Sequence, residues 1–217
     1  MILSGYGINL VRVKHEHIEL VRHWRNTERI RSFMEYREEI TPEMQEAWFN
    51  KINNRNNGYF LIEVEGNFIG LINGRDIDWE KKITGSGGIF IWDESWWNTT
   101  IPVAAVMLFI ETSYLLGLDL NYVNVLRTNT HAISFNKSLG YELLPGQDDI
   151  ENQQYILTER SFFEKTKKLR EILQRRWGSI FTCVISDPNE DAAANILAIG
   201  AAFDNVQRAK FVITVES

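Results

Sequence analysis

Apolar residues recur along this chain with two different spacings, and each spacing predicts one kind of secondary structure. Runs in which apolar and polar residues alternate are typical of strands. They lie at residues 8–13, 58–64, 67–78, 83–92, 121–127, 141–144, 153–158, 179–186 and 210–216. The tripeptide Glu65–Asn67 joins the second and third runs, and this predicts a β-hairpin. Gly85, Gly87 and Gly88 predict an irregular or bulged entry to the strand that follows the hairpin.

Apolar residues spaced three and four apart predict helices in most of the remaining chain. The helical segments are residues 16–34, 41–52, 101–116, 129–140, 162–176 and 187–203. Thr41 as N-cap with Pro42 at the first helical position marks one helix start, and Asp187 with Pro188 marks another. A break is expected near Asn26 in the first helix. The third helix is apolar nearly all round, so we expect it to be buried against a sheet.

The order of these elements predicts an α/β (α+β) fold with a mixed, twisted sheet flanked by helices over residues 1–158. An amphipathic connecting helix at residues 159–177 then leads to a small strand-helix-strand appendage at residues 178–217. With 217 residues and 44% hydrophobic content, the chain has room for one medium domain and such an appendage.

Charge and composition narrow the possible functions. The net charge of -6 disfavours a protein that binds nucleic acid through its overall field, and the one basic helix, residues 164–176, is interpreted as a solvated face. The first residues acquire charge too early for a secretory signal, and no apolar run is long enough for a membrane span. The single cysteine, Cys183, excludes an internal disulfide and fits a reducing cytoplasm.

The four histidines do not predict a metal site. They are His15, His17, His23 and His131. No HExxH pattern accompanies them, and Cys183 has no companion at metal-ligand spacing, so we interpret all four as surface or capping residues and expect no metal.

Two segments resemble the GNAT superfamily of acyl-CoA-dependent N-acyltransferases. Residues 129–141, "NTHAISFNKSLGY", are similar to the late helix of that family, in which Asn-x-x-Ala leads to a Lys, a Leu-Gly pair and an aromatic residue. Residues 24–34 and 40–49 are similar to the first two helices of the branch that contains ribosomal-protein alanine and amino-sugar-nucleotide acetyltransferases. The resemblance covers roughly residues 8–158. It implies acetyl-CoA as the acyl-donor cosubstrate and a small-molecule amine as the acceptor.

The stretch "WNTTIP", residues 97–102, takes the place of the family's glycine-containing pyrophosphate turn. Trp97 stands at the family's Gln or Arg, Thr100 at the first glycine and Pro102 at the second. In the family, the preceding strand pairs with the pantetheine arm of coenzyme A. The resemblance therefore implies cofactor contacts by Trp92, Asn98, Thr99, Thr100, Val103 and Asn129.

The missing glycines leave two interpretations of this turn. Threonine restricts the close backbone approach that glycine allows, and proline removes one N–H donor. However, Asn98, Thr99 and Thr100 add three side chains that can donate hydrogen bonds, and the helix dipole is retained. The turn is either an altered phosphate-binding site or simply a good helix cap.

The resemblance also assigns the chemistry, which is direct attack of an amine on the thioester. Many family members use a tyrosine in the late helix as the acid, and Asn136 stands there in this chain. An amide does not act as a practical general acid, so we expect Asn136 to stabilise the leaving thiolate by hydrogen bonding. Glu94 is the candidate base, acting through water, while Asp93 caps the turn. Both carboxylates are equally well interpreted as solvated loop residues.

Trp24, Arg25, Asn26 and Arg75 are the candidate substrate residues, because arginine binds phosphate or carboxylate through its planar fork. The first functional hypothesis is an N-acyltransferase for a small amine such as a nucleotide-linked amino sugar. The second is a protein N-terminal acetyltransferase. The third is a degenerate GNAT-like module that only binds a ligand or a partner.

The tail predicts an assembly. Residues 178–217 contain too little apolar surface to form a core unaided, so their faces must be covered by the main sheet or by a second chain. The strands at 179–186 and 210–216 would otherwise leave open edges, so we expect a homodimer through this unit.

Overall fold

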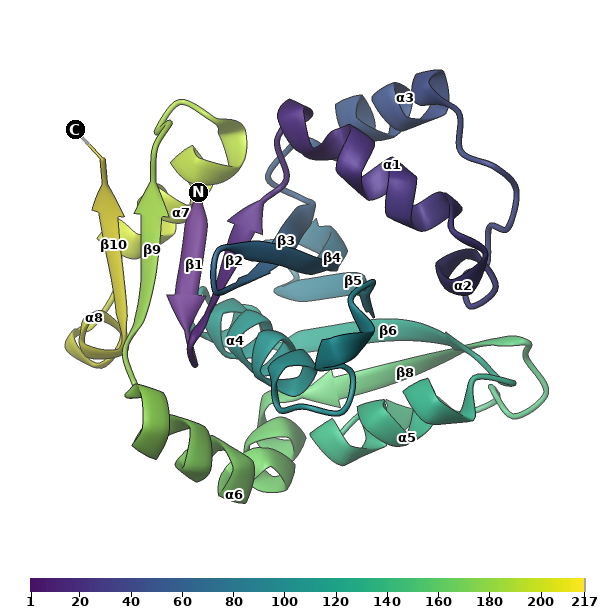
Figure 1. Ribbon diagram of the computed structural model, residues 1–217. Coiled ribbons are helices and arrows are strands. Elements are labelled where there is room, and N and C mark those ends of the chain that lie inside the picture. The colour runs from purple at the N-terminus through teal and green to yellow at the C-terminus, as the bar shows by residue number, and fades with distance from the viewer. Residues whose placement is uncertain (217) are drawn as a thin grey trace.

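The computed structural model describes residues 1–216, which form an open ten-stranded sheet with helices on both faces (Figure 1). The strands are β1 (Ile2–Gly5), β2 (Ile8–Arg12), β3 (Gly58–Val64), β4 (Asn67–Asp78), β5 (Ile83–Ile91), β6 (Leu120–Leu126), β7 (Glu142–Leu143), β8 (Asn152–Thr158), β9 (Phe181–Ile185) and β10 (Phe211–Val215). Their order in the sheet is β10-β9-β1-β2-β3-β4-β5-β6-β8-β7. Two pairs are parallel, β9 with β10 and β5 with β6, so the predicted mixed sheet flanked by helices is confirmed.

Most helices begin and end close to the predicted positions, but the start predicted at Asp187 and Pro188 is wrong, because those residues form a turn and the helix begins at Asp191 with Glu190 as its N-cap. They are α1 (Ile18–Asn26), α2 (Glu28–Arg31), α3 (Pro42–Ile52), α4 (Ile101–Leu115), α5 (Thr130–Leu139), α6 (Glu159–Trp177), α7 (Asp191–Ala201) and α8 (Asn205–Lys210), with short 3-10 turns η1 (His15–His17) and η2 (Glu94–Trp96). The expected break after Asn26 is real, because Thr27 adopts an extended conformation between α1 and α2. Thr41 caps α3 as predicted, and its hydroxyl accepts from the backbone N–H of Met44.

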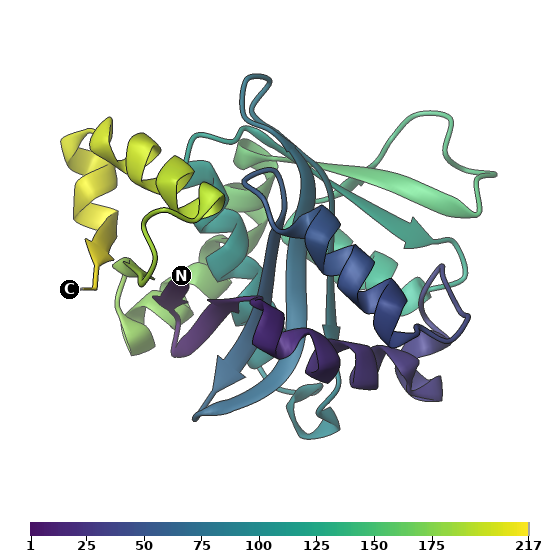
Figure 2. The same cartoon turned by 90° about the horizontal axis from the view of Figure 1, so that it is seen from above.

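Two hydrophobic cores lie on opposite faces of the sheet (Figure 2). Helix α4 is buried in the larger core, as its all-round apolar sequence predicts, and there its Leu108 is fully buried. Helices α1 and α3 cover the other face, where Leu61, Leu71 and Trp92 point toward them. This second face is therefore separated from α4 by the full thickness of the sheet.

The entry to β5 is irregular, as predicted, but no bulge forms there. Asp76, which lies opposite Gly85, has φ +54°, and this pair is missing from the ladder, although β4 and β5 keep the same register on both sides, from Gly70↔Ile91 to Asp78↔Ile83. Gly85 allows close approach, since a Cβ on it would lie 3.0 Å from the backbone oxygen of Asp76. A true register shift lies in the hairpin, where the pairing of β3 with β4 shifts between Ile62 and Glu63.

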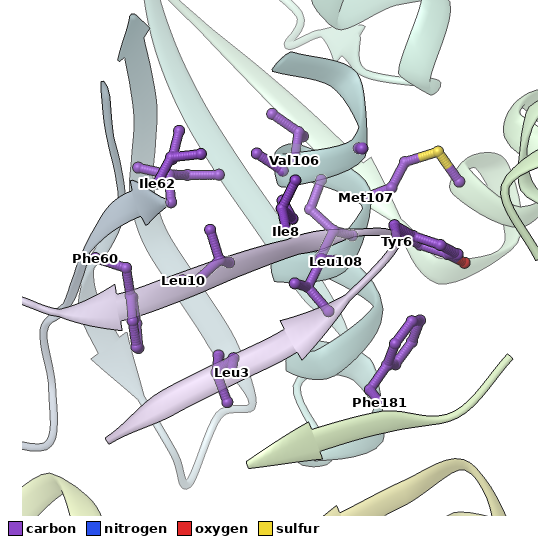
Figure 3. Packing of buried hydrophobic residues seen from close by; sticks show 14 of the residues in the cluster. Leu3, Tyr6, Ile8, Leu10, Phe60, Ile62, Val106, Met107, Leu108 and Phe181 are labelled. Atoms are coloured by element: carbon purple, nitrogen blue, oxygen red, sulfur yellow. The ribbon is translucent and has the colours of Figure 1, made fainter. Parts of the chain in front are cut away.

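The C-terminal strand-helix-strand unit extends the main sheet, with α8 as an additional short helix. Strand β9 pairs antiparallel with β1, and its Phe181, Cys183 and Ile185 are buried in the larger core. Figure 3 shows Phe181 near Leu108 of α4 and near the ring of Tyr6, whose centroid lies 5.1 Å from that of Phe181. Strand β9 therefore needs no second chain to close its edges, contrary to the prediction, and of the two tail strands only β10 lies at the outer edge.

Buried polar contacts also fix this unit in place. The guanidinium of Arg12, in β2, pairs with Glu190 at the start of α7 and donates to the carbonyls of Asn57 and Asn54, each at 3.0 Å. The backbone N–H of Arg55 donates to the α7 carboxylate of Asp191 at 2.8 Å. Among residues 1–216, none of the helices combines the length and apolar character needed to cross a membrane.

Candidate active site

The sheet opens between β5 and β6. These parallel strands pair only at Ile83 and Thr84 of β5, although β5 continues to Ile91. Farther along, the one hydrogen bond described between the strands joins the Ser86 hydroxyl to Asn124 Oδ1 at 3.4 Å. Figure 2 shows β6 and β8 leaving the direction of β4 and β5. The far half of β5 thus presents peptide groups to which an extended ligand can add as a strand does.

Trp92, a predicted cofactor residue, has every polar group engaged within the protein. Its backbone N–H donates to Ile69 O and its indole N–H donates to Phe68 O, both at 2.9 Å, while Arg29 donates to its carbonyl. The ring is 3% exposed and stacks on Trp24 with 5.7 Å between centroids. Trp92 therefore offers no free hydrogen-bonding group to a ligand.

Ile89 and Ile91 are the positions of β5 that face the opening. Peptide groups along a strand point alternately to its two sides, and Trp92 N–H points to β4. The groups of Ile91 and Ile89 therefore point away from β4 toward β6. Part of this edge is occupied, because the indole N–H of Trp97 donates to Ile91 O at 3.0 Å.

The loop from β5 into α4 is held by its own side chains. Asp93 accepts from the backbone N–H and the hydroxyl of Ser95, at 3.1 and 2.6 Å, and these bonds hold the pKa of Asp93 below its usual value. The hydroxyl of Thr99 donates to Trp96 O at 2.7 Å and accepts from Ile101 N–H at 3.2 Å. Thr99 is thus a capping residue, and its hydroxyl is already bonded on both sides.

The start of α4 nevertheless retains a compact set of donors. Within residues 1–216, no protein acceptor meets the backbone N–H groups of Asn98, Thr100 and Val103 or the side chains of Asn98 and Thr100. Pro102 has no N–H, and Ala104 N–H already donates to Thr100 O at 2.9 Å. Asn98 and Thr100 are exposed. This combination of exposed donors and the positive end of a 15-residue helix can bind an anion.

Glu94, the candidate base, is paired with Arg29 of α2. The same guanidinium bonds Glu94, bonds the carbonyl of Trp92 and lies 5.4 Å from the ring centroid of Trp97. The Glu94 side chain remains 56% exposed. Arg29 therefore fixes the direction of this carboxylate beside the loop while water still reaches it.

Asn129 and Asn136 lie on α5, which follows β6. The side-chain oxygen of Asn129 caps α5 by accepting from Ala132 N–H at 3.1 Å, and the amide of Asn136 donates to Ala132 O at 2.9 Å. Each amide nitrogen carries two hydrogens, so Asn129 keeps both and Asn136 keeps one. No hydrogen bond joins either residue to the loop before α4 within the described part of the chain.

Arg25 and Arg75 approach the same tyrosine on the sheet face that α1 and α3 cover. Burial raises the pKa of Tyr59 above its usual value, and the positive charges of Arg75 and Arg25 both oppose that rise. The guanidinium of Arg25 lies 5.9 Å from the ring centroid of Phe90, and Arg75 donates to the hydroxyl of Ser86 at 3.4 Å. Both of these predicted substrate residues therefore lie within electrostatic range of Tyr59.

The other two predicted substrate residues have structural contacts. Asn26 exchanges two hydrogen bonds with the backbone of Ile40, at 2.9 and 2.8 Å, and so fastens the loop between α2 and α3. Trp24 is half-buried against Trp92. Of the four residues, Arg25 and Arg75 are the ones with cationic groups directed at this face.

Sequence reasoning missed Arg29, Trp97 as an indole donor, and Tyr59. Arg29 stands in an ordinary amphipathic helix, 65 residues before Glu94, and no local signal marks the pair. Trp97 was assigned only as the residue that replaces the family's Gln or Arg. Side chains alternate along β3, so Tyr59 points to the face opposite to that of Phe60. This alternation is the one signal in the sequence that would have assigned Tyr59 to the face covered by α1 and α3.

Other possible sites lie elsewhere or are absent from the described chain. Two cavities lie away from the opening between β5 and β6. One, of about 390 Å³, is lined by α7, α8 and β10, and the other, of about 60 Å³, lies between α4, α7 and the inner strands. Over residues 1–216, no group of three or more His, Cys, Asp or Glu side chains is placed to hold a metal ion.

Comparisons with known proteins agree with this geometry. Residues 8–142 match a family described as acetyltransferase (GNAT) domain. A search among curated proteins gave no significant match. Among solved structures, the nucleotide-linked sugar GNAT FdhC in its apo form aligns with TM-score 0.66 and 20% identity, over 80% of this chain and 98% of its own.

Two further structures align over nearly their whole length. The spermidine N-acetyltransferase from Vibrio cholerae, in complex with CoA and spermine, gives TM-score 0.62 and 16% identity over 72% of this chain and 98% of its own. The aminoglycoside acetyltransferase AAC(6')-Ib, in complex with coenzyme A, gives TM-score 0.60 and 15% identity over 74% of this chain and 99% of its own. At such identities the likeness concerns the fold.

Proposed function

Because the chain belongs to the GNAT acetyltransferase family, we propose that it transfers the acetyl group of acetyl-CoA to the primary amine of a small molecule, such as a nucleotide-linked amino sugar. The observation that carries this proposal is the set of exposed, unpaired donors at the start of α4, beside the opening between β5 and β6. Donors at a helix start suit a pyrophosphate, and an open strand edge suits an extended amide chain.

The donors have separate proposed tasks. Asn98, Thr100 and Val103 bind the pyrophosphate with backbone N–H groups and two side chains, while Thr99 maintains the loop. Ile89 and Ile91 offer their peptide groups to the pantetheine arm, in place of the fully bonded Trp92. The free amide hydrogens of Asn129 are directed to the cofactor from α5. A turn without glycine thereby replaces close backbone approach with side-chain donors.

The chemistry proposed is direct transfer. After the ammonium has lost its proton, the neutral amine forms a C–N bond with the thioester carbonyl carbon, the C–S bond breaks, the thiolate leaves with the electron pair, and the nitrogen releases its second proton to water. Asn136 retains one amide hydrogen, which stabilises the thiolate without protonating it. Glu94, oriented by Arg29, accepts the ammonium proton through water.

A substitution at Asn136 tests this assignment. Asn136→Ala is expected to lower kcat about 10-fold or more while the acetyl-CoA affinity changes little, because the bond strengthens only as charge builds on sulfur. Steady-state kinetics and calorimetry measure the two quantities. Equal losses in kcat and affinity would reduce Asn136 to a cofactor contact.

We divide the tasks of the chain as follows. Residues 1–158 carry the acyltransferase chemistry, residues 159–177 connect the two parts, and residues 178–217 support β1 by pairing β9 with it.

The assembly proposed is a homodimer in a reducing cytoplasm, formed through β10. The outer edge of β10 has no Pro, charge or bulge in Phe211–Val215 to oppose pairing. Light scattering on the full chain and on Val212→Lys tests it: a dimer that the exposed lysine dissociates is expected, and a full-length monomer contradicts it.

Ligand titration tests the cofactor site. Acetyl-CoA, desulfo-CoA and free CoA are each titrated by calorimetry into the wild type and into Asn98→Ala/Thr100→Val. Charged hydrogen bonds contribute about 1.5–3 kcal/mol each, so the double variant should bind at least about 10-fold more weakly. Thr214→Val, the same change on exposed β10, is the matched control and should bind normally. Absence of any binding by the wild type would favour the degenerate module.

A further inference from the structure

Arg25 is a half-buried cation that has no hydrogen-bond acceptor or carboxylate partner within residues 1–216. Its Nη1 is inaccessible to solvent and has no hydrogen-bond acceptor within residues 1–216. Burial lowers the pKa of the Arg25 guanidinium, and Tyr59, which is not a carboxylate, is the one group whose charge opposes this. A polar atom that is removed from water without a hydrogen-bond partner costs about 1–3 kcal/mol, and a bound anion would remove this cost at Nη1.

Other buried or half-buried arginines of the chain show what a structural arginine receives. Arg12 has a carboxylate, Glu190, and two backbone carbonyls. Arg29 has Glu94 and the carbonyl of Trp92, although its Nε also lacks a partner within residues 1–216. Arg170 has one unpaired nitrogen, but its charge opposes the rise in the pKa of Glu111 that burial causes, so a carboxyl group lies within its electrostatic range. Arg25 differs from all three, which indicates that its partner comes from outside the chain.

A second cation stands on the same face. The charge of Arg75, like that of Arg25, opposes the rise in the pKa of Tyr59, and the side chain of Arg75 is 48% exposed. The carboxylate of Asp76 is 4.0 Å from Arg75, and it is 77% exposed, so water screens this pair. From Arg75, hydroxyl and amide groups continue through Ser86 to Asn124 at the β5–β6 opening. The cations are therefore linked by polar groups to the place where the thioester is expected.

We propose that Arg25 and Arg75 bind an anionic group, a phosphate or a carboxylate, carried by the acceptor amine. The guanidinium fork matches both groups with paired hydrogen bonds, and Phe90 supplies an apolar surface beside Arg25. The inference rests on the acyltransferase function proposed above and narrows its acceptor. Polycationic amines, such as the spermine bound to the Vibrio cholerae structure, are disfavoured because the two arginines repel them.

Binding of an isolated anion tests the site without any turnover. Pyrophosphate and uridine diphosphate are titrated into the protein saturated with CoA, so that the helix start is already filled, and the melting temperature is recorded. We expect both to raise the melting temperature of the wild type and not that of Arg25→Met. Arg160→Met, which removes an exposed arginine from α6, is the matched control and should respond as the wild type does. No response of the wild type at 10 mM, taken as roughly the weakest affinity of interest, overturns the proposal.

The ligand-free stability of the variant separates binding from structure. Arg25→Met removes a half-buried charge that has no partner within residues 1–216, so its melting temperature without ligand should equal or exceed that of the wild type. A clear decrease would assign Arg25 to the fold and contradict the proposal.

An acceptor panel then tests the consequence for specificity. The panel contains a nucleoside-diphosphate-linked amino sugar, the same amino sugar without phosphate, and spermidine. Arg25→Met should lower kcat/KM for the phosphate-bearing amine about 10- to 100-fold, mainly through KM, and leave the phosphate-free sugar unchanged. Arg25→Lys should recover part of the loss, since it keeps the charge without the fork. Equal losses for all acceptors, or a preference for spermidine, contradict the subsite. Failure to use or bind acetyl-CoA would instead refute the acyltransferase function.

Discussion

Glu111→Gln is expected to make the protein more stable at high pH. Glu111 lies on α4 and is 6% exposed, and it accepts a hydrogen bond from the hydroxyl of Tyr6 at 2.8 Å. Burial raises the pKa of Glu111 from 4.5 to about 7, although the Tyr6 bond and the charges of Arg170 and Lys210 oppose the rise. Between pH 4.5 and about pH 7, Glu111 is therefore still protonated in the native protein, whereas in the unfolded chain it has already ionised.

The sign and size of the effect follow from proton linkage. The contribution of Glu111 to the free energy of unfolding is largest below about pH 4.5. It falls as pH rises to about 7, because burial destabilises the ionised form of Glu111 in the folded state and not in the unfolded chain. Each pKa unit corresponds to about 1.4 kcal/mol, so the wild type loses about 3 kcal/mol by about pH 8. Glutamine cannot ionise, and its carbonyl still accepts from Tyr6.

Urea denaturation between pH 5 and pH 8 measures this difference. Wild type and Glu111→Gln should have similar free energies of unfolding near pH 5, and the variant should be about 3 kcal/mol more stable near pH 8. Glu171→Gln, an exposed change on α6, should leave the pH dependence unaltered. Parallel curves for wild type and Glu111→Gln, or a variant that is less stable at pH 8, would refute the assigned protonation.

Three other predictions concern the fold. Arg12→Met should lower the free energy of unfolding by about 3–5 kcal/mol in urea, since it leaves Glu190 and two carbonyls without their partner, and a loss below about 1 kcal/mol would contradict this. Gly140→Ala should cost about 1–3 kcal/mol in the same assay, because φ is +103° and the new Cβ would lie 2.8 Å from Ser161 O; an unchanged midpoint would show that the backbone relaxes. Truncation after Arg176 should give an aggregating chain by light scattering and circular dichroism, since it uncovers the edge of β1, and a folded soluble product would contradict it.

Most elements were accessible from the sequence because local signals determine them, whereas β1, α8 and the start of α7 at Asp191 were not predicted. Thr41 and Pro42 mark a helix start that needs no distant partner, and the extended Thr27 after Asn26 gives the break its place. The apolar surface of α4 required a sheet, and the sheet is there. Such features depend on neighbours within a few residues, which the sequence displays directly.

The partners of polar side chains were not accessible, because they come from remote elements. Arg25 and Arg29 are four residues apart, on α1 and α2, yet within residues 1–216 one has no acceptor and the other bonds a carboxylate 65 residues away. Asn26 looked like a substrate residue and fastens a loop to Ile40 instead. The pairing of β9 with β1 likewise joins the two ends of the chain, which no local pattern predicts.

The central claim is that a turn without glycine supports acetyl transfer, and one assay tests it most directly. Release of free CoA thiol from acetyl-CoA is followed together with the mass of a phosphate-bearing amino sugar, for the wild type and for Asn98→Ala/Thr100→Val. The account predicts equal amounts of thiol and acetylated amine from the wild type, and a KM for acetyl-CoA at least about 10-fold higher in the double variant. A wild type that binds the amine and acetyl-CoA yet forms no acetylated product, or a double variant with unchanged kinetics, would contradict it.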